Sequence, residues 1–506
     1  MPTSPQVGRR PIEQHPDFLS GLREAGPELA DKRWAVRRLP RAPFSRRPPR
    51  RARAVVAQAR ALPKPEREHR TDRAPDREGR GPHGAAHQGA RVERAAGDRL
   101  PAQRARGGPR SALHDQGRVN ITSQITPRSP TLSPAGRGKL PVANLYIHLP
   151  FCKHKCGYCD FNAYAGMDRL MPDYVDALER ELAAAREQRE FSQLSTVYLG
   201  GGTPSLLPAD LIARLLRFLR GTFDIAPDAE VTLEANPAST DESRLAAWLE
   251  GGVNRLSLGV QGFEPRALAV LERKTDAAQA TRAFTLARSM GVANLSIDLI
   301  YAVPHQSRES WVETLCRALA LGPDHVSTYC LTFEEGTLLW RRRAEGKLPE
   351  LDPDLQWDQL DSACDELEAA GFRRYEVSNW ARPGFESRHN LAYWRCRPVY
   401  GAGAGAHSYA TDGTRAWRWW NVARPREYIA ACPAPRADGE ELPERKAGAE
   451  ALMLGLRTAE GVAPRAGFED ELGRLADAGL IESIDGRVAP TRRGMDLHNQ
   501  IALAVL

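Results

Sequence analysis

Six strand patterns that alternate with helical patterns limit the possible folds of this chain more than any other feature of its sequence. We expect strands at 144–148, 196–199, 230–234, 255–259, 294–300 and 325–331, and helices at 173–188, 208–219, 241–250, 265–272, 276–290 and 308–321. Strand–helix alternation of this kind predicts parallel pairing with right-handed crossovers. The fold class is therefore expected to be α/β, with a partial (β/α)6 TIM-like barrel over residues 141–350. The chemistry of such a barrel lies at the carboxyl ends of its strands.

Three cysteines directly follow the first expected strand. Cys152, Cys156 and Cys159 have the spacing C-x3-C-x2-C. Three thiolates on one loop can hold three irons of a [4Fe–4S] cluster and leave the fourth iron open to a substrate or cofactor. Zinc or unliganded thiols are the alternative, but structural zinc favours two Cys-x2-Cys knuckles or Cys/His pairs, and the sequence has no second knuckle.

This cysteine spacing resembles the signature of the radical S-adenosylmethionine (radical SAM) superfamily. Further motifs follow the other strands, among them Gly200-Gly-Gly-Thr-Pro204 and the stretch from Asp298 to Gln306. They are similar to those of the subfamily that contains oxygen-independent coproporphyrinogen III dehydrogenase. The resemblance implies a cluster on the three cysteines and S-adenosylmethionine contacts from Tyr146, Tyr158, Gly201, Gly202, Thr203, Glu234, Gln261, Arg273 and Asp298. Simple alternatives stay open: aromatic packing for the two tyrosines and a solvated strand-end carboxylate for Glu234.

Two stretches depart from the pattern of that subfamily. Ala302 and His305 stand where its members usually carry glycine, and Lys274-Thr275 replaces a sequence that usually ends in His. The departures affect details of the substrate site rather than the cluster.

Beyond the barrel, the run His389-Asn-Leu-Ala-Tyr-Trp394 is followed by a glycine-rich segment that ends in Ala-His-Ser-Tyr409. Together they resemble the HemW family of haem chaperones. Phe161 stands where the dehydrogenase has a fourth cysteine, which also favours the chaperones. The resemblance implies haem binding by His389, Asn390, Tyr393 and Trp394. Haem also requires cations for its propionates, and three nearby arginines could supply them: Arg388, Arg395 and Arg397. A histidine between aromatic residues is also commonly a packed, hydrogen-bonded residue, and His407 is a second candidate ligand.

The resemblance implies a haem chaperone that holds a [4Fe–4S] cluster and S-adenosylmethionine and transfers haem to haemoproteins, with respiratory proteins as the expected recipients. The alternative is a dehydrogenase that decarboxylates a porphyrinogen through a deoxyadenosyl radical. A homodimer and peripheral membrane contact are left open. The eight cysteines lack paired spacing, and no apolar run approaches the ~20 residues of a membrane span, so we expect a cytoplasmic protein.

Composition divides the rest of the chain. Residues 1–140 hold 30 Lys and Arg against 13 Asp and Glu, with much Pro and Gly, which predicts a disordered leader. It is interpreted as an extension outside the working protein, a passive tail, or a basic arm for nucleic acid or an anionic membrane. Residues 351–440 are expected to form a haem-binding α+β region, and residues 441–506 a winged-helix-like module. This module has 8 basic against 11 acidic residues, so we expect no nucleic-acid partner.

Overall fold

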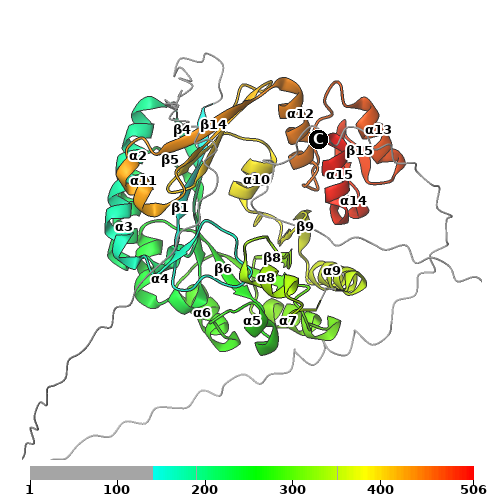
Figure 1. Ribbon diagram of the computed structural model, residues 1–506, viewed down its shortest axis with the longest axis horizontal. Helices are drawn as coiled ribbons and strands as arrows, with labels where there is room; N and C mark the ends of the chain where they lie inside the picture. Colours follow the sequence, from blue (N-terminus) through cyan, green and yellow to red (C-terminus); the bar gives the residue numbers. More distant parts are fainter. Residues whose placement is uncertain (1–140, 190, 350–351) are drawn as a thin grey trace, which may run out of the picture. The chain divides into compact units, whose positions relative to one another are not determined.

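The computed structural model of the protein describes residues 141–189, 191–349 and 352–506 (Figure 1). The predictions for the leader, residues 1–140, lie outside the described residues.

The six expected core strands are confirmed, and they lie side by side in chain order. They are β1 (Val142–Leu149), β4 (Phe191–Gly201), β5 (Ile225–Ala235), β6 (Arg255–Gln261), β7 (Asn294–Tyr301) and β8 (His325–Cys330). Every neighbouring pair is parallel. Parallel pairing requires a crossover between successive strands, and the expected helices provide it.

Those helices are α2 (Met171–Gln188), α3 (Ala209–Thr222), α4 (Glu242–Glu250), α5 (Pro265–Val270), α6 (Ala277–Ser289) and α7 (Arg308–Ala320), and Figure 1 shows them along the outer side of the sheet. Local sequence explains where several of them begin. The side chains of Asp241 and Ser307 accept hydrogen bonds from the first turns of α4 and α7, and Asp276 forms a capping box with Gln279 at the start of α6. Their apolar faces pack on the strands in one large core, which includes Leu216, Trp248, Phe284 and Trp311.

The sheet continues past both edges of the six-stranded core. On the β1 side, β11 (Val399–Ala402) pairs parallel with β1, and β12 (His407–Thr411), β13 (Ala416–Asn421) and β14 (Arg436–Leu442) follow in antiparallel order. On the β8 side, β10 (Asn379–Ala381) and β9 (Arg373–Glu376) are antiparallel. Within the described residues, the strand order runs from β14 to β9 without closing on itself. The prediction of a partial barrel is therefore confirmed.

Further helices accompany the added strands: α8 (Leu338–Ala344), α9 (Pro353–Ala369), α10 (Arg388–Trp394) and α11 (Pro425–Ala431). Helix α10 contacts both β4 of the core and α12 of the C-terminal segment. It therefore connects two parts of the protein that are far apart in sequence.

The C-terminal segment consists of α12 (Glu444–Gly455), α13 (Glu469–Asp477), the hairpin β15 (Ile481–Ile484) and β16 (Arg487–Pro490), α14 (Arg492–Asp496) and α15 (His498–Val505). It has a hydrophobic cluster of its own, with Leu452, Leu456, Leu475 and Ile501 at its centre. Two helices precede the hairpin, and two more follow it. The winged-helix assignment stays a prediction. No helix among the described residues combines the length and apolarity that crossing a membrane requires.

Candidate functional site

The cysteine loop leaves the carboxyl end of β1 and is closed by two very short strands. Strand β2 (Phe151–Cys152) pairs parallel with β3 (Tyr164–Ala165). Inside the loop, the amide of Cys159 donates to the carbonyl of Cys156 at 3.1 Å. Cys152, Cys156 and Cys159 are all free thiols. The backbone therefore folds the run into a compact turn that holds its three sulfurs on one loop.

Burial determines the protonation of two of these thiols. It raises the pKa of Cys152, and it raises the pKa of Cys159 to about 12. The charges of the neighbouring cysteines also raise both pKa values. Within the described part of the chain, no three His, Cys, Asp or Glu side chains are placed to hold a single metal ion. A cubane differs from such a site because its three ligands bind three separate iron atoms.

The glycine run after β4 lies directly against the cysteine loop. The amide of Gly202 donates to the carbonyl of Leu149 at 2.9 Å, and the Thr203 hydroxyl lies 3.5 Å from Cys152 Sγ. A Cβ atom added to Gly202 would meet the Phe151 carbonyl oxygen at 2.7 Å, and Gly201 has a φ of 114°. Only glycine fits this close approach of two backbones without displacement.

Glu234 fixes the glycine run from the end of β5. Its carboxylate accepts the amide of Gly201 at 3.0 Å and the hydroxyl of Tyr198 at 2.6 Å. Each carboxylate oxygen has a second lone pair, so Glu234 can still accept hydrogen bonds from a ligand.

Arg273 connects the cysteine loop to the end of β6. Its guanidinium donates to Cys156 Sγ at 3.6 Å and to the carbonyl of Gly259, while its buried Nε has no hydrogen-bond partner. Gln261 ends β6 just after a bulge and has a φ of 69°. A non-glycine residue in this left-handed region is strained, and such strain gathers at ligand sites.

Asp298 on β7 lies among three serine hydroxyls. Its carboxylate accepts from Ser257 at 3.0 Å, from Ser327 at 2.7 Å and from Ser296 at 3.4 Å. Burial raises the pKa of Asp298, and the serine hydrogen bonds oppose that rise. Three serine hydroxyls therefore hold this side chain in place.

Two tyrosines complete the set expected from the sequence. The hydroxyl of Tyr146 is 2.9 Å from His148 Nδ1, and the Tyr146 ring stacks on Tyr198 with centroids 6.0 Å apart. Tyr158 packs against a cluster that includes Leu339, and burial raises its pKa. The residues expected to bind cluster and cofactor thus lie on the carboxyl halves of β1, β4, β5, β6 and β7, or on the loops that follow.

The motif expected to bind haem lies on helix α10, against the middle of β4 and β5. Glu230, in the middle of β5, accepts the amides of Arg388 and His389 at 2.9 and 3.0 Å. His389 Nδ1 lies 2.7 Å from the Thr196 hydroxyl, and its Nε2 lies 3.3 Å from the Tyr393 hydroxyl. The imidazole is only 1% exposed, and burial lowers its pKa to about 3.

Both ring nitrogens of His389 therefore have partners. Ligation of haem iron by His389 stays a prediction, and it would require one ring nitrogen to give up its present hydrogen-bond partner.

The other end of the motif contacts a different part of the protein. Trp394 packs against the hydrophobic cluster of the C-terminal segment, and the Arg457 guanidinium lies 4.4 Å from the centre of its ring. Asn390 lies in the first turn of α10, where its backbone amide donates to the hydroxyl of the capping residue Ser387 at 3.4 Å.

The sequence-based prediction missed several residues that shape the site. Tyr198, His148 and Ser257 supply direct contacts to predicted site residues, and Thr196 and Glu230 hold α10. The alternation of residues along each strand could have indicated them. Within each strand these polar residues alternate with apolar ones that face the helices.

Comparison with known proteins agrees with this geometry. Residues 146–317 match the model of the radical SAM superfamily. The chain is 40% identical over 372 residues to Heme chaperone HemW of Mycobacterium tuberculosis, which covers 72% of this chain and 94% of that protein. It is 33% identical over 378 residues to Heme chaperone HemW of Bacillus subtilis, which covers 72% of this chain and 99% of that protein.

Among solved structures, coproporphyrinogen III oxidase (HemN) from Escherichia coli, a radical SAM enzyme, matches with a TM-score of 0.63. The match covers 74% of this chain and 91% of that chain at 24% identity. At this identity the likeness supports a common fold.

Proposed function

We propose that this chain, which belongs to the HemW family of radical SAM proteins, is a haem chaperone. It would have separate binding sites for cofactor and haem. A [4Fe–4S] cluster and S-adenosylmethionine would be held at the carboxyl end of the strands. Haem would be held near α10 and passed on to haemoproteins.

Observations on this chain support the cofactor site. Three cysteines are on one loop, the adjoining glycine run leaves no room for a Cβ at Gly202, and Arg273 has a buried Nε without a partner. Three thiols and a buried donor without a partner fit a cluster with an amino-acid ligand. Cys152, Cys156 and Cys159 would hold the cluster. Thr203 and Arg273 would orient the methionyl group, and Glu234 and Asp298 would accept hydrogen bonds from the ribose. When bound, the cluster would supply an electron to the sulfonium of S-adenosylmethionine.

The position of the α10 motif is the observation that favours a chaperone over an enzyme. A dehydrogenase has to place its porphyrinogen next to the radical, whereas a chaperone has no such need. Here the layer formed by Tyr146 and Tyr198 lies between His389 and the glycine run. Haem bound near α10 would therefore stay away from the cluster. Phe161, in place of a fourth cysteine, points the same way.

A titration tests this proposal. Anaerobically reconstituted protein should take up haem, read from its visible absorbance, and should form no protoporphyrinogen from coproporphyrinogen under reducing conditions. His389→Gln should weaken haem uptake and leave the iron–sulfur content unchanged, because the two sites are separate. Efficient decarboxylation of coproporphyrinogen by the wild-type protein would reject the chaperone and favour the dehydrogenase.

A further inference from the structure

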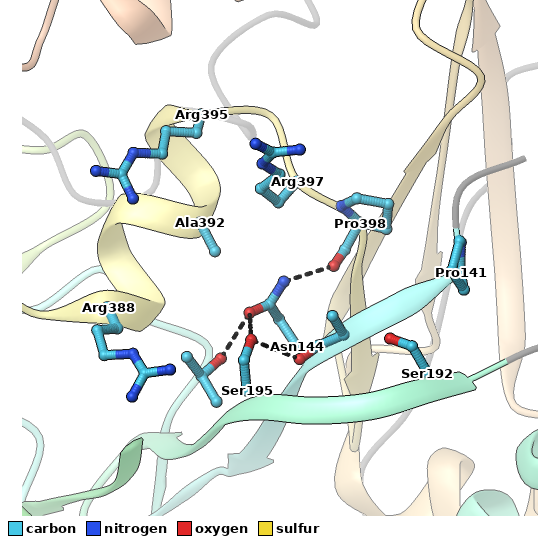
Figure 2. Close-up of a pocket in the computed structure, with 11 residues that line it drawn as sticks. Pro141, Asn144, Ser192, Ser195, Arg388, Ala392, Arg395, Arg397 and Pro398 are labelled. Atoms are coloured by element: carbon cyan, nitrogen blue, oxygen red, sulfur yellow. Dashed lines mark hydrogen bonds between the residues drawn. The ribbon is translucent and has the colours of Figure 1, made fainter. Parts of the chain in front are cut away.

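A pocket of about 460 Å³ lies between the beginnings of β1 and β4 and the segment from α10 to Pro398 (Figure 2). This volume is within the range of small-molecule and cofactor sites. Its lining residues, all in the described part of the chain, include no acidic side chain: they are Pro141, Ala143, Asn144, Ser192, Ser195, Thr196, Arg388, Ala392, Arg395, Arg397 and Pro398. We call it the arginine pocket.

Hydrogen bonds fix one wall of the arginine pocket. Asn144 Nδ2 donates to the Pro398 carbonyl at 3.0 Å, and Asn144 Oδ1 accepts from the hydroxyls of Ser195 at 3.2 Å and Thr196 at 2.9 Å (Figure 2). The polar groups of this wall are satisfied internally. A ligand would therefore meet a wall that is already ordered, which lowers the entropic cost of binding.

The three arginines differ in how strongly the protein already engages them. Arg395 pairs with Glu460 through two bonds of 2.7 Å, and Arg388 donates to the Asp228 carbonyl at 2.6 Å. The amide of Arg397 donates to the Ala392 carbonyl at 2.8 Å, but its exposed guanidinium has no hydrogen bond or ion pair with any described residue, although its charge helps to lower the pKa of Glu460. Arg397 is thus the arginine most available to an anionic ligand.

The surrounding charge makes this cluster of arginines unusual. Residues 141–506 carry 41 Lys and Arg against 51 Asp and Glu, so the pocket is a positive site on a negative region of the chain. A smaller pocket of about 160 Å³ shares Arg395 and Arg397 and adds Arg465. Guanidinium groups bind carboxylates in a planar, two-pronged geometry, and prolines and alanines offer an apolar surface beside them.

We propose that the arginine pocket binds the two propionate carboxylates of haem, with Arg397 as the principal contact and Arg388 as the second. This inference rests on the proposed function and adds the mode of recognition. None of the lining residues is a histidine, cysteine, methionine or tyrosine, so the pocket recognises the carboxylates rather than the iron.

The test compares haem with haem dimethyl ester, in which both propionates are blocked and the macrocycle and iron are unchanged. Wild-type protein should bind haem at least about ten-fold more tightly than the ester. Arg397→Gln should lose most of this preference by weakening haem binding alone, and Arg388→Gln should lose part of it. Arg426→Gln, on exposed α11, is the matched control and should behave as the wild type.

The outcomes separate the two proposals. Wild-type protein that binds neither haem nor the ester would overturn the proposed function and this inference with it. Equal affinity for the two compounds, or an Arg397→Gln variant that loses both equally, would overturn the arginine pocket and leave haem binding in place. Arg397→Glu serves as a second variant, since it should weaken haem more than the neutral substitution does. Thermal unfolding of each variant reports that it is folded.

Discussion

The Thr196 hydroxyl and His389 Nδ1 lie 2.7 Å apart, although 193 positions separate them in sequence. Thr196 belongs to the core strand β4, and His389 to the first turn of α10. Both side chains are about 1% exposed. This contact attaches the helix that carries the family motif to the interior of the barrel.

Thr196→Val should therefore destabilise the protein. Valine keeps the shape of threonine but leaves His389 Nδ1 without its buried partner, which costs about 1–3 kcal/mol. Urea unfolding would measure the loss. Ser192→Ala, at the partly exposed rim of the arginine pocket, should change the stability by less than about 0.5 kcal/mol. An unchanged midpoint for Thr196→Val would show that His389 does not depend on this contact.

The three loop cysteines should each be required for the cluster. Alanine at Cys152, Cys156 or Cys159 should remove most of the visible absorbance and iron after anaerobic reconstitution, because two thiolates hold a cubane poorly. Cys316 is an exposed thiol on α7, and Cys316→Ala is the control that should keep its iron. Full iron content in any of the three loop variants would contradict the assignment.

His305 should be a site at which glycine stabilises the protein. It is exposed and has a φ of 70°, a conformation that costs an ordinary residue about 1–2 kcal/mol. The greater flexibility of glycine in the unfolded chain offsets part of this gain. His305→Gly should thus raise the free energy of unfolding by about 0.5–1 kcal/mol. Arg282→Gly, on the exposed face of α6, should lower it by about 1 kcal/mol.

Ala302 provides an internal comparison for that experiment. It has a φ of 59° but is buried, so Ala302→Gly also removes a packed methyl group and should gain less than His305→Gly. A larger gain at Ala302 would contradict this explanation.

Acid should destabilise the protein partly through His498. This side chain is buried beside the Met453 carbonyl at 2.9 Å, and burial lowers its pKa to about 3. In the unfolded chain it takes up a proton near pH 6.5, so the stabilisation is fully present above that pH. It is lost at about 1.4 kcal/mol per pH unit as the pH falls from 6.5 towards 3.

The measurement is urea unfolding at pH 7.5 and at pH 5. His498→Gln, which can still donate to Met453, should reduce the difference between the two stabilities by about 2 kcal/mol. His305→Asn changes an exposed histidine and tolerates a positive φ, so it should leave that difference as it is. An unaltered difference for His498→Gln would count against a neutral, buried His498.

The sequence was sufficient for the six-stranded core because each strand and helix has its own local pattern. Val197 and Leu199, for example, alternate with Thr196 and Tyr198 along β4, and Asp276 marks the start of α6. The added strands β9 to β14 could not be placed in the same way. Their pairing depends on tertiary contacts, such as Asn144 with Pro398, that join residues 254 positions apart.

In the candidate site, too, local features could be predicted from the sequence and tertiary contacts could not. The spacing of the cysteines and glycines is local, so their place at the ends of β1 and β4 could be predicted. The orientation of His389 could not, since it is set by Thr196 and Glu230 on two other strands. The gathering of Arg388, Arg395 and Arg397 around one pocket likewise depends on how α10 packs on β1 and β4.

Strand β5 carries both carboxylates that organise the two ends of the barrel. Glu230 holds the amides of α10, and Glu234, four residues further on, holds the glycine run. Four residues of extended chain span about 13 Å. Residues four apart on a strand face the same side of the sheet, so β5 acts as a ruler that sets how far α10 and the glycine run lie from each other along one face.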